Sequence, residues 1–200
     1  MRLPDAPIIC CISEGRANAD NFREVRSSIL EKIKIASRFS VNIFQIREKS
    51  LTAEQLFDLT SSAVDAANGQ VLIFLNDRVD IALAAGAAGV HLPSCGLPVD
   101  WVRRHVGSGL LIGVSTHSME EAVSARDSGA DYAAFGPVFE SPGKGNGVGM
   151  MELASVCAAA APMPVLALGG IEEKQANEAI RSGAAGFAAI RHLNKLLEPK

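Results

Sequence analysis

The sequence predicts a single-domain (β/α)8 barrel, a ring of eight parallel strands that alternate with helices. Short apolar runs alternate with amphipathic helical stripes along the whole chain, which is typical of β-α units and a parallel sheet. Eight such units favour a closed barrel over an open doubly wound sheet. Segments 85–90, 128–132 and 182–187 are near copies in which a glycine ends a helix before the next strand, which supports the count.

Length and composition agree with this fold. The chain has 200 residues, which we assign to one domain, residues 1–200. Hydrophobic residues make up 48% of the sequence and aromatic residues only 5%. A composition rich in small and branched aliphatic residues is typical of buried parallel strands covered by helices.

The first half of the chain contains four expected units. Helical spacing predicts a helix from Phe22 to Ala36, and the capping box of Thr52 and Gln55 predicts the start of the next helix. A brief helix over 81–85 ends at Gly86. The strands that we expect here span 8–12, 41–46, 71–75 and 90–92.

The second half continues the pattern. The fifth strand runs from Leu110 towards His117, and Ser118 stands three residues before Glu121, the spacing of a capping box. Further strands are expected at 132–135, 165–168 and 187–190, with helices over 150–160 and up to about residue 182. The glycine-rich loop 136–149 is long enough to indicate a function, and only 191–200 are left for a short or incomplete last helix.

Charge and cysteine content exclude several classes of protein. The net charge is −3 and no dense basic cluster is present, which argues against nucleic-acid binding. No secretory signal or membrane-spanning run is evident, so we expect a cytoplasmic protein without a membrane partner. None of the four cysteines forms a Cys-x-x-Cys motif, and only Cys95, in a loop, lacks an evident core role.

Polar residues gather where the expected strands end. In a barrel these positions converge on one mouth, where chemistry is usually placed. The cations among them would make an electropositive pocket suited to a phosphorylated small molecule, and a Gly-Gly turn can bind phosphate through backbone N–H groups. The converging residues are Gln45, Arg47, Lys49, Asn76, Asp77, Ser94, Ser115, His117, Lys144, Gly169, Gly170 and Arg191.

Two of these positions, Asp77 and His117, and a further histidine, His91, have simpler structural interpretations. Asp77 can instead cap the helix that follows it. His91 lies inside a strand and is interpreted as a hydrogen-bonded core histidine. His117 either decorates the start of a helix or transfers protons, since an imidazole with a pKa near about 6.5 both accepts and returns a proton at neutral pH.

The motifs together resemble those of the thiamine phosphate synthase and thiazole tautomerase superfamily of (β/α)8 barrels. They are Gln45-Ile46-Arg47-Glu48-Lys49, Asn76-Asp77-Arg78, Ser115-Thr116-His117, residues 132–139 and Gly169-Gly170-Ile171. The synthase resemblance implies that Gln45, Arg47, Lys49, Asn76, Ser115 and Lys144 bind a pyrimidine pyrophosphate. It implies that Asp77 binds one Mg²⁺, and that Ser141, Gly143, Gly169, Gly170, Ile190 and Arg191 bind a thiazole phosphate.

Several positions depart from the synthase pattern. The stretch Pro93-Ser94-Cys95-Gly96 lacks the carboxylate that gives synthases a second Mg²⁺ ligand. Ser141-Pro142-Gly143-Lys144 replaces a Thr-x-Thr-Lys loop, and Arg191 stands where a serine is expected. At Leu92-Pro93-Ser94, 115–122 and Gly147-Val148 the chain resembles the tautomerases more closely.

These departures favour a metal-independent thiazole tautomerase that aromatises a thiazole carboxylate phosphate, with His117 as acid and base. Arg191, Lys144 and the Gly169-Gly170 amides would bind the phosphate, with Arg47 or Lys49 on the carboxylate. One alternative is a synthase that joins the pyrimidine to the thiazole with Mg²⁺ at Asp77 and releases pyrophosphate. Another is a non-catalytic or regulatory protein that binds a thiamin intermediate, and in each case the resemblance implies a homodimer.

Overall fold

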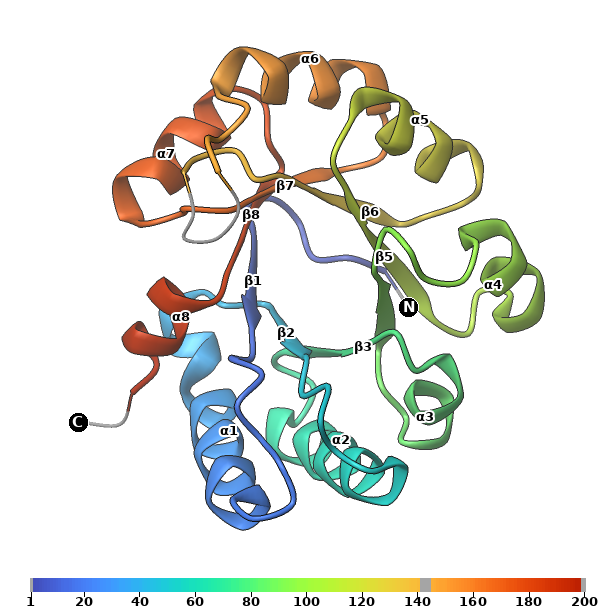
Figure 1. Ribbon diagram of the computed structural model, residues 1–200, viewed down its shortest axis with the longest axis vertical. Coiled ribbons are helices and arrows are strands. Elements are labelled where there is room, and N and C mark those ends of the chain that lie inside the picture. Colours follow the sequence, from blue (N-terminus) through green and yellow to red (C-terminus); the bar gives the residue numbers. More distant parts are fainter. Residues whose placement is uncertain (1, 141–144, 199–200) are drawn as a thin grey trace.

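Eight parallel strands close into a barrel in the order in which they occur in the chain (Figure 1). The structure, a computed structural model, describes residues 2–140 and 145–198. The fold class predicted from the sequence is confirmed. The strands are β1 (Ile8–Ile12), β2 (Ile43–Ile46), β3 (Leu72–Asn76), β4 (Gly89–Leu92), β5 (Leu111–Thr116), β6 (Tyr132–Phe135), β7 (Val165–Leu168) and β8 (Gly186–Ala189).

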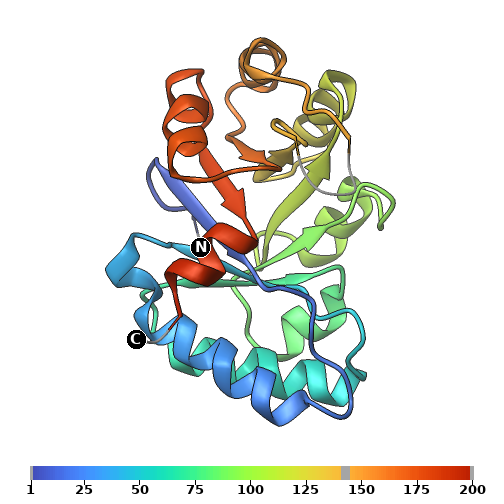
Figure 2. The ribbon, with the colours of Figure 1, turned by 60° about the vertical axis from the view of Figure 1, so that its left-hand side comes forward.

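Helices surround the barrel, and both ribbon views show them on its outer side (Figures 1 and 2). The last helix, α8, is short, as predicted, and lies on the side of α1. A short 3₁₀ turn, Ser37–Phe39, follows α1. The helices are α1 (Phe22–Ala36), α2 (Ala53–Ala67), α3 (Val79–Ala84), α4 (Val99–Val106), α5 (Met119–Asp127), α6 (Met150–Ala160), α7 (Glu173–Arg181) and α8 (Arg191–Leu196).

Helices α2 and α5 both begin at the expected capping residues, and the first of them has a complete capping box. Thr52 caps α2, with hydrogen bonds in both directions between Thr52 and Gln55. Ser118 caps α5 by accepting a hydrogen bond from the backbone N–H of Glu121. Both helices therefore begin where local side-chain chemistry places them.

The start of β2 differs from the expectation. The strand begins at Ile43 rather than Val41, and just before it Asn42 contacts the first strand through both its backbone and its side chain. Its Oδ1 accepts a hydrogen bond from the backbone N–H of Ile9 at 2.8 Å, and its Nδ2 donates to the carbonyl of Pro7 at 3.2 Å. Because the backbone N–H of Asn42 also donates to the carbonyl of Ile9 at 3.1 Å, the side chain adds to the backbone ladder at this point.

The core has an outer layer between strands and helices and an inner layer inside the barrel. Phe74 and Tyr132 fill the inner layer with an edge-to-face contact at 5.6 Å between ring centroids. Gly113 leaves space for Tyr132, since a Cβ at Gly113 would lie 2.2 Å from Cζ of that ring. The barrel interior is therefore packed, and a ligand has access only at an end.

Some surface features also bear on the sequence predictions. Trp101, on α4, is 42% exposed and stacks on His105. Cys10 and Cys11 are buried as expected, whereas Cys95 is exposed. In the described part of the chain, none of the helices has the length and apolar character needed to cross a membrane.

Candidate active site

A cavity of about 940 Å³ opens where the carboxyl ends of the strands meet. Most of the residues predicted to bind substrate line it, although they come from distant parts of the chain. They are Gln45, Arg47, Lys49, Asn76, Ser94, Ser115, His117, Gly169, Gly170, Ile190 and Arg191. The parallel barrel brings them together because every strand ends at the same rim.

The remaining predicted residues are placed differently. Asp77 does not line this cavity but a neighbouring one of about 340 Å³, which shares Lys49 and Asn76 with it. Its side chain does not cap α3, since the N-cap of that helix is Arg78 and no side-chain cap is formed. Ser141, Gly143 and Lys144 lie outside the described residues.

Gln45 provides a hydrogen-bond acceptor inside the cavity. The residue is 2% exposed, and its Nε2 donates to Oδ1 of Asn76 at 3.2 Å. Its Oε1 is buried and finds no hydrogen-bond partner among the described residues. Because a buried polar atom without a partner costs free energy, Gln45 favours a ligand that brings an N–H or O–H group.

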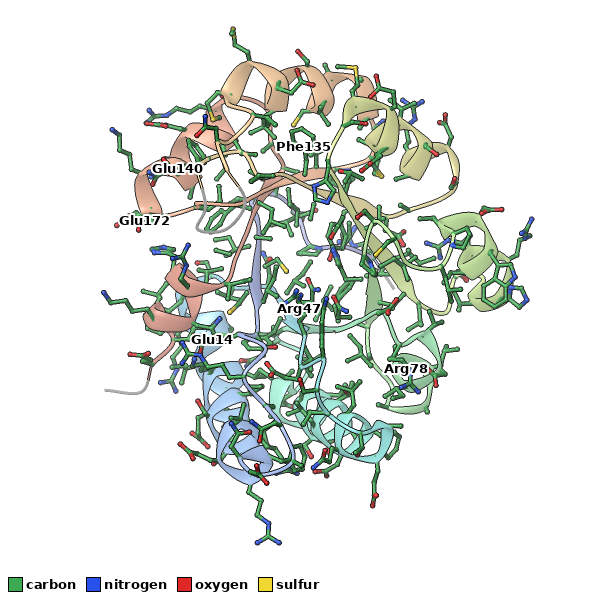
Figure 3. The ribbon with its side chains drawn as sticks, in the orientation of Figure 1. Glu14, Arg47, Arg78, Phe135, Glu140 and Glu172 are labelled. Atoms are coloured by element: carbon green, nitrogen blue, oxygen red, sulfur yellow. The ribbon has the colours of Figure 1, made fainter. Side chains whose placement is uncertain are left out.

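Three basic residues give the cavity a positive charge. Within residues 2–140 and 145–198, no carboxylate forms an ion pair with Arg47, Lys49 or Arg191. Their charges are therefore available to an anionic ligand. Glu140 and Glu172 also line the cavity, and Figure 3 shows both on the α7 side, with Arg47 near the centre of the barrel.

His91 lies at the floor of the cavity and is 3% exposed. Its Nδ1 is 2.9 Å from the hydroxyl of Tyr132, and its Nε2 is 2.9 Å from Oγ of Ser115. Burial first, and then the positive charge of Arg47, lower the pKa of His91 to about 4. The ring is thus neutral at physiological pH, with one nitrogen donating and the other accepting, and it fixes the Ser115 hydroxyl.

His117 stands at the rim of the cavity and is exposed. Its Nδ1 lies 2.5 Å from the carbonyl of Gly136, to which it can only donate, so Nε2 is the acceptor in the neutral ring. The backbone N–H of His117 donates to Oε2 of Glu121 at 2.7 Å. The polar run at the start of α5 therefore makes local hydrogen bonds that hold His117 in place.

The Gly169-Gly170 turn follows β7 and needs glycine at both positions. Their φ angles are +98° and +63°, in the left-handed region that favours glycine. A Cβ at Gly170 would lie 2.4 Å from the carbonyl oxygen of Glu140, and one at Gly169 would lie 2.7 Å from Cα of Pro137. The turn packs against residues 137–140, which follow β6, and lines the cavity.

The smaller cavity offers few carboxylates that could bind a metal ion. Among the described residues, no three His, Cys, Asp or Glu side chains cluster as metal ligands. Glu48 lines the smaller cavity, but its carboxylate accepts the backbone N–H groups of Gly15 and Ala17 at 2.9 and 2.7 Å. Asp77 is the other carboxylate of that cavity, and within the described residues its side chain accepts no hydrogen bond that would compete with a metal ion.

Known proteins resemble this chain over most of its length. Residues 12–193 match the family described as thiamine monophosphate synthase. The chain belongs to this family. A thiamine-phosphate synthase of Chlorobium luteolum is 36% identical over 100% of the chain and 91% of that protein. A putative thiamine-phosphate synthase of Geobacter sulfurreducens is 44% identical over 81% of the chain and 78% of that protein.

Structural comparison agrees with this assignment. The barrel of this family member is similar to a thiamine phosphate pyrophosphorylase from Pyrococcus furiosus, with a TM-score of 0.79 and 27% identity. The match covers 96% of this chain and 92% of that chain. Both comparisons therefore place the chain in an enzyme family of thiamin biosynthesis.

The expectation of a thiazole tautomerase is wrong. Relatives that are 33–44% identical over most of the chain carry the synthase name instead. The run 115–122 misled the sequence interpretation because part of it serves a local purpose. Ser118 caps α5, and Glu121 accepts a hydrogen bond from the backbone N–H of His117. These two residues therefore stabilise the start of a helix and do not indicate a particular reaction.

The sequence interpretation missed several residues of the cavity. His91 was assigned to the core, which is correct for its burial, but it also contacts Ser115 and lines the cavity. Glu172 also lines the cavity, and its position two residues after the Gly169-Gly170 turn could have identified it from the sequence. The other polar or charged residues missed are Glu140, Gln175 and His192, and the apolar residues missed include Ile12, Leu168, Ala188 and Ala189.

Proposed function

We propose that this chain is a thiamine phosphate synthase, which joins hydroxymethylpyrimidine pyrophosphate to thiazole phosphate and releases pyrophosphate. The observation that carries the proposal concerns Gln45, which lines the same cavity as Arg47 and Lys49. Its buried Oε1 has no hydrogen-bond partner in the part of the chain that the structure describes. The cavity thus offers a hydrogen-bond acceptor for a ring substituent next to cations for a pyrophosphate. The synthase names of the relatives support it.

In this proposal the β2–β5 side of the cavity binds the pyrimidine pyrophosphate. Gln45 accepts a hydrogen bond from the pyrimidine amino group, and Asn76 holds Gln45 in place. As the bond to pyrophosphate breaks, negative charge builds up on the leaving group. Arg47 and Lys49 are positioned to stabilise that charge without reorganisation, which is the usual source of a large rate effect. Ser115, oriented by neutral His91, donates a further hydrogen bond.

The β7–β8 side binds the thiazole phosphate. The Gly169-Gly170 turn offers backbone N–H groups, and Arg191 offers the positive charge. Glu140 and Glu172 line the same side, so the phosphate depends on Arg191 to offset their charge. This arrangement leaves the two substrates facing each other across one cavity.

The residues present fit a Mg²⁺ ion that is bound largely through the substrate. Mg²⁺ is usually held by one or two carboxylates together with substrate phosphates, and Asp77 supplies one carboxylate beside Lys49. When bound there, the ion would neutralise charge on the pyrophosphate. The homodimer and the cytoplasmic location stay predictions.

The test is pyrophosphate release by the purified protein with both substrates, with and without Mg²⁺. We expect release to require Mg²⁺ and to fall at least about a hundredfold in Asp77→Ala, because the metal loses its protein carboxylate. Asp80→Ala is the matched control, since Asp80 pairs with Arg78 and lines neither cavity. Binding of both substrates without product would contradict the proposal and identify a non-catalytic binding protein.

A further inference from the structure

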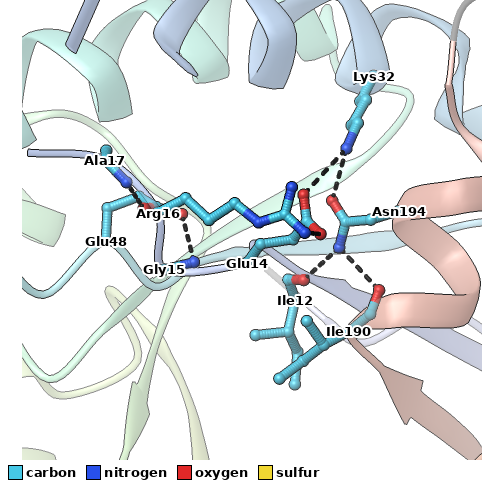
Figure 4. Close-up of polar contacts among 9 residues, drawn as sticks. All are labelled: Ile12, Glu14, Gly15, Arg16, Ala17, Lys32, Glu48, Ile190 and Asn194. Carbon is cyan, nitrogen blue, oxygen red and sulfur yellow. Dashed lines mark hydrogen bonds and ion pairs between the residues drawn. The ribbon is translucent and has the colours of Figure 1, made fainter. Parts of the chain in front are cut away.

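The side-chain amide of Asn194, on α8, is buried against the end of β1 (Figure 4). Asn194 is 3% exposed. Its Nδ2 donates to the carbonyl of Ile12 at 2.7 Å and to the carbonyl of Ile190 at 2.8 Å. A single amide group therefore ties the first strand of the barrel to the residue that precedes the last helix.

The Ile12 carbonyl needs this partner because the backbone ladder ends before it. The last register pair between β1 and β8 is Cys11 with Ala189. Beyond this pair, Nδ2 of Asn194 supplies the hydrogen-bond donor for the carbonyl of Ile12. A buried carbonyl without a donor would cost free energy, so the amide extends the barrel seam by one hydrogen bond.

Lys32, on α1, sets the orientation of that amide. Its Nζ donates to Oδ1 of Asn194 at 3.0 Å, which leaves Nδ2 facing the two carbonyls. Lys32 is only 5% exposed, and its charge is balanced by Oε2 of Glu14 at 3.6 Å. Glu14 in turn pairs with Arg16 at 2.7 Å. The polar cluster thus reaches from α1 through the end of β1 to α8.

The cluster lies directly behind one wall of the active-site cavity. Ile12 and Ile190, whose carbonyls it binds, both line the cavity, as does Arg191. The helix α8 spans only Arg191–Leu196, and no side chain caps its start. A helix this short has little stability of its own, so tertiary contacts decide where its first turn lies.

We infer that Asn194, oriented by Lys32, is a positioning residue that holds the Ile190–Arg191 turn where the thiazole phosphate binds. The inference rests on the proposed function for the identity of the ligand. It assigns a role to a buried lysine and asparagine that contact no substrate. Because the cluster contacts β1 and α8 rather than β2–β5, its loss weakens the phosphate end of the cavity selectively.

The first test compares Asn194→Leu with Thr60→Val. The leucine is close in size to asparagine but donates no hydrogen bond. Thr60→Val removes another buried hydrogen bond, from Thr60 Oγ1 to the carbonyl of Leu56 in α2, away from the cavity. Thermal melts verify that both variants fold. Calorimetry with thiazole phosphate and steady-state KM values for both substrates give the readouts.

We expect Asn194→Leu to raise the Kd and KM for thiazole phosphate about tenfold and to leave the KM for the pyrimidine pyrophosphate within about twofold. Thr60→Val should change neither constant. Equal increases in both KM values, or an unchanged Kd in a folded Asn194→Leu protein, would overturn the inference and leave the cluster a purely structural feature.

Lys32 provides a second test that keeps both donor bonds of Asn194. Lys32→Met should raise the Kd for thiazole phosphate about threefold, because the amide loses the bond that orients it, and Lys32→Arg should restore most of the affinity. If Asn194→Leu does not fold, this pair decides, and an unchanged Kd in Lys32→Met overturns the inference.

The calorimetric readout separates this inference from the proposed function. If the unmodified protein binds thiazole phosphate but makes no product, the synthase proposal fails and the comparison of Kd values still decides the role of Asn194. If the unmodified protein binds neither thiazole phosphate nor inorganic phosphate, both fail.

Discussion

The β2–β5 side of the cavity is built from side chains that hold one another, whereas the β7–β8 side is built from backbone turns. On the first side, Gln45 contacts Asn76, and His91 contacts Ser115. On the second, glycine turns and the start of a short helix are held from behind, by loop packing and by Asn194. The two halves of one cavity therefore depend on different kinds of interaction, and substitutions should separate them.

The largest expected effect is on the side-chain half. Arg47→Met removes a cation from the pyrophosphate site while keeping an apolar stem, and we expect kcat/KM to fall about 10²- to 10³-fold. Most of the loss should concern the pyrimidine pyrophosphate rather than the thiazole phosphate. Steady-state kinetics with each substrate varied in turn measures this.

Arg104→Met makes the same charge change on the outer face of α4, where Arg104 pairs with Asp100. It should leave kcat/KM unchanged. If Arg47→Met behaved like this control, the pyrophosphate would have to bind elsewhere and the proposed division of the cavity would be wrong.

The second prediction concerns the pH dependence of stability. The native pKa of His91 is about 4, against 6.5 for the free side chain. Between these values the unfolded chain binds more protons than the native protein, so stability decreases as pH falls through this window and is unaffected above it. The contribution lost is about 3 kcal/mol for the shift from 6.5 to about 4.

His91→Gln removes this titration while keeping polar atoms near Ser115 and Tyr132. The variant is less stable at pH 7, since the packing changes, but its melting temperature should fall less between pH 6.5 and 4.5 than that of the unmodified protein. Thermal melts across this range provide the comparison, and parallel curves would show that His91 is not held neutral by burial.

The smallest of the three effects is expected on the backbone half. Gly170→Ala places a Cβ against the carbonyl of Glu140 and at a φ of +63°, so the turn must shift. We expect the KM for thiazole phosphate to rise about tenfold with little change in the KM for the pyrimidine pyrophosphate. Steady-state kinetics measures both.

Gly86→Ala is a matched control, since Gly86 has a φ of +70° and no atom of residues 2–140 or 145–198 lies within 4 Å of the added Cβ. It carries the same backbone strain far from the turn after β7. A similar rise in both KM values for Gly170→Ala would show that the turn supports the whole cavity rather than the phosphate alone.

Several parts of the fold and of the site could be predicted from local sequence. The strands at Ile8–Ile12, Tyr132–Phe135 and Val165–Leu168 have the expected bounds because short apolar runs between turn signals leave little ambiguity. Most predicted substrate residues line one cavity, since polar residues that follow a strand reach the rim of any parallel barrel. The choice of reaction could not be predicted from the run 115–122, because capping and catalysis use the same residue types there.

The sequence by itself determined the alternation of strands and helices, their capping residues and the set of polar residues at the rim, because these depend on neighbours a few positions apart. Only the tertiary structure decided that His91 both fills the core and orients Ser115, and that Lys32 reaches Asn194 across 162 positions of sequence. Such contacts depend on how the barrel closes, and closure brings together residues whose local sequence gives no sign of the partner.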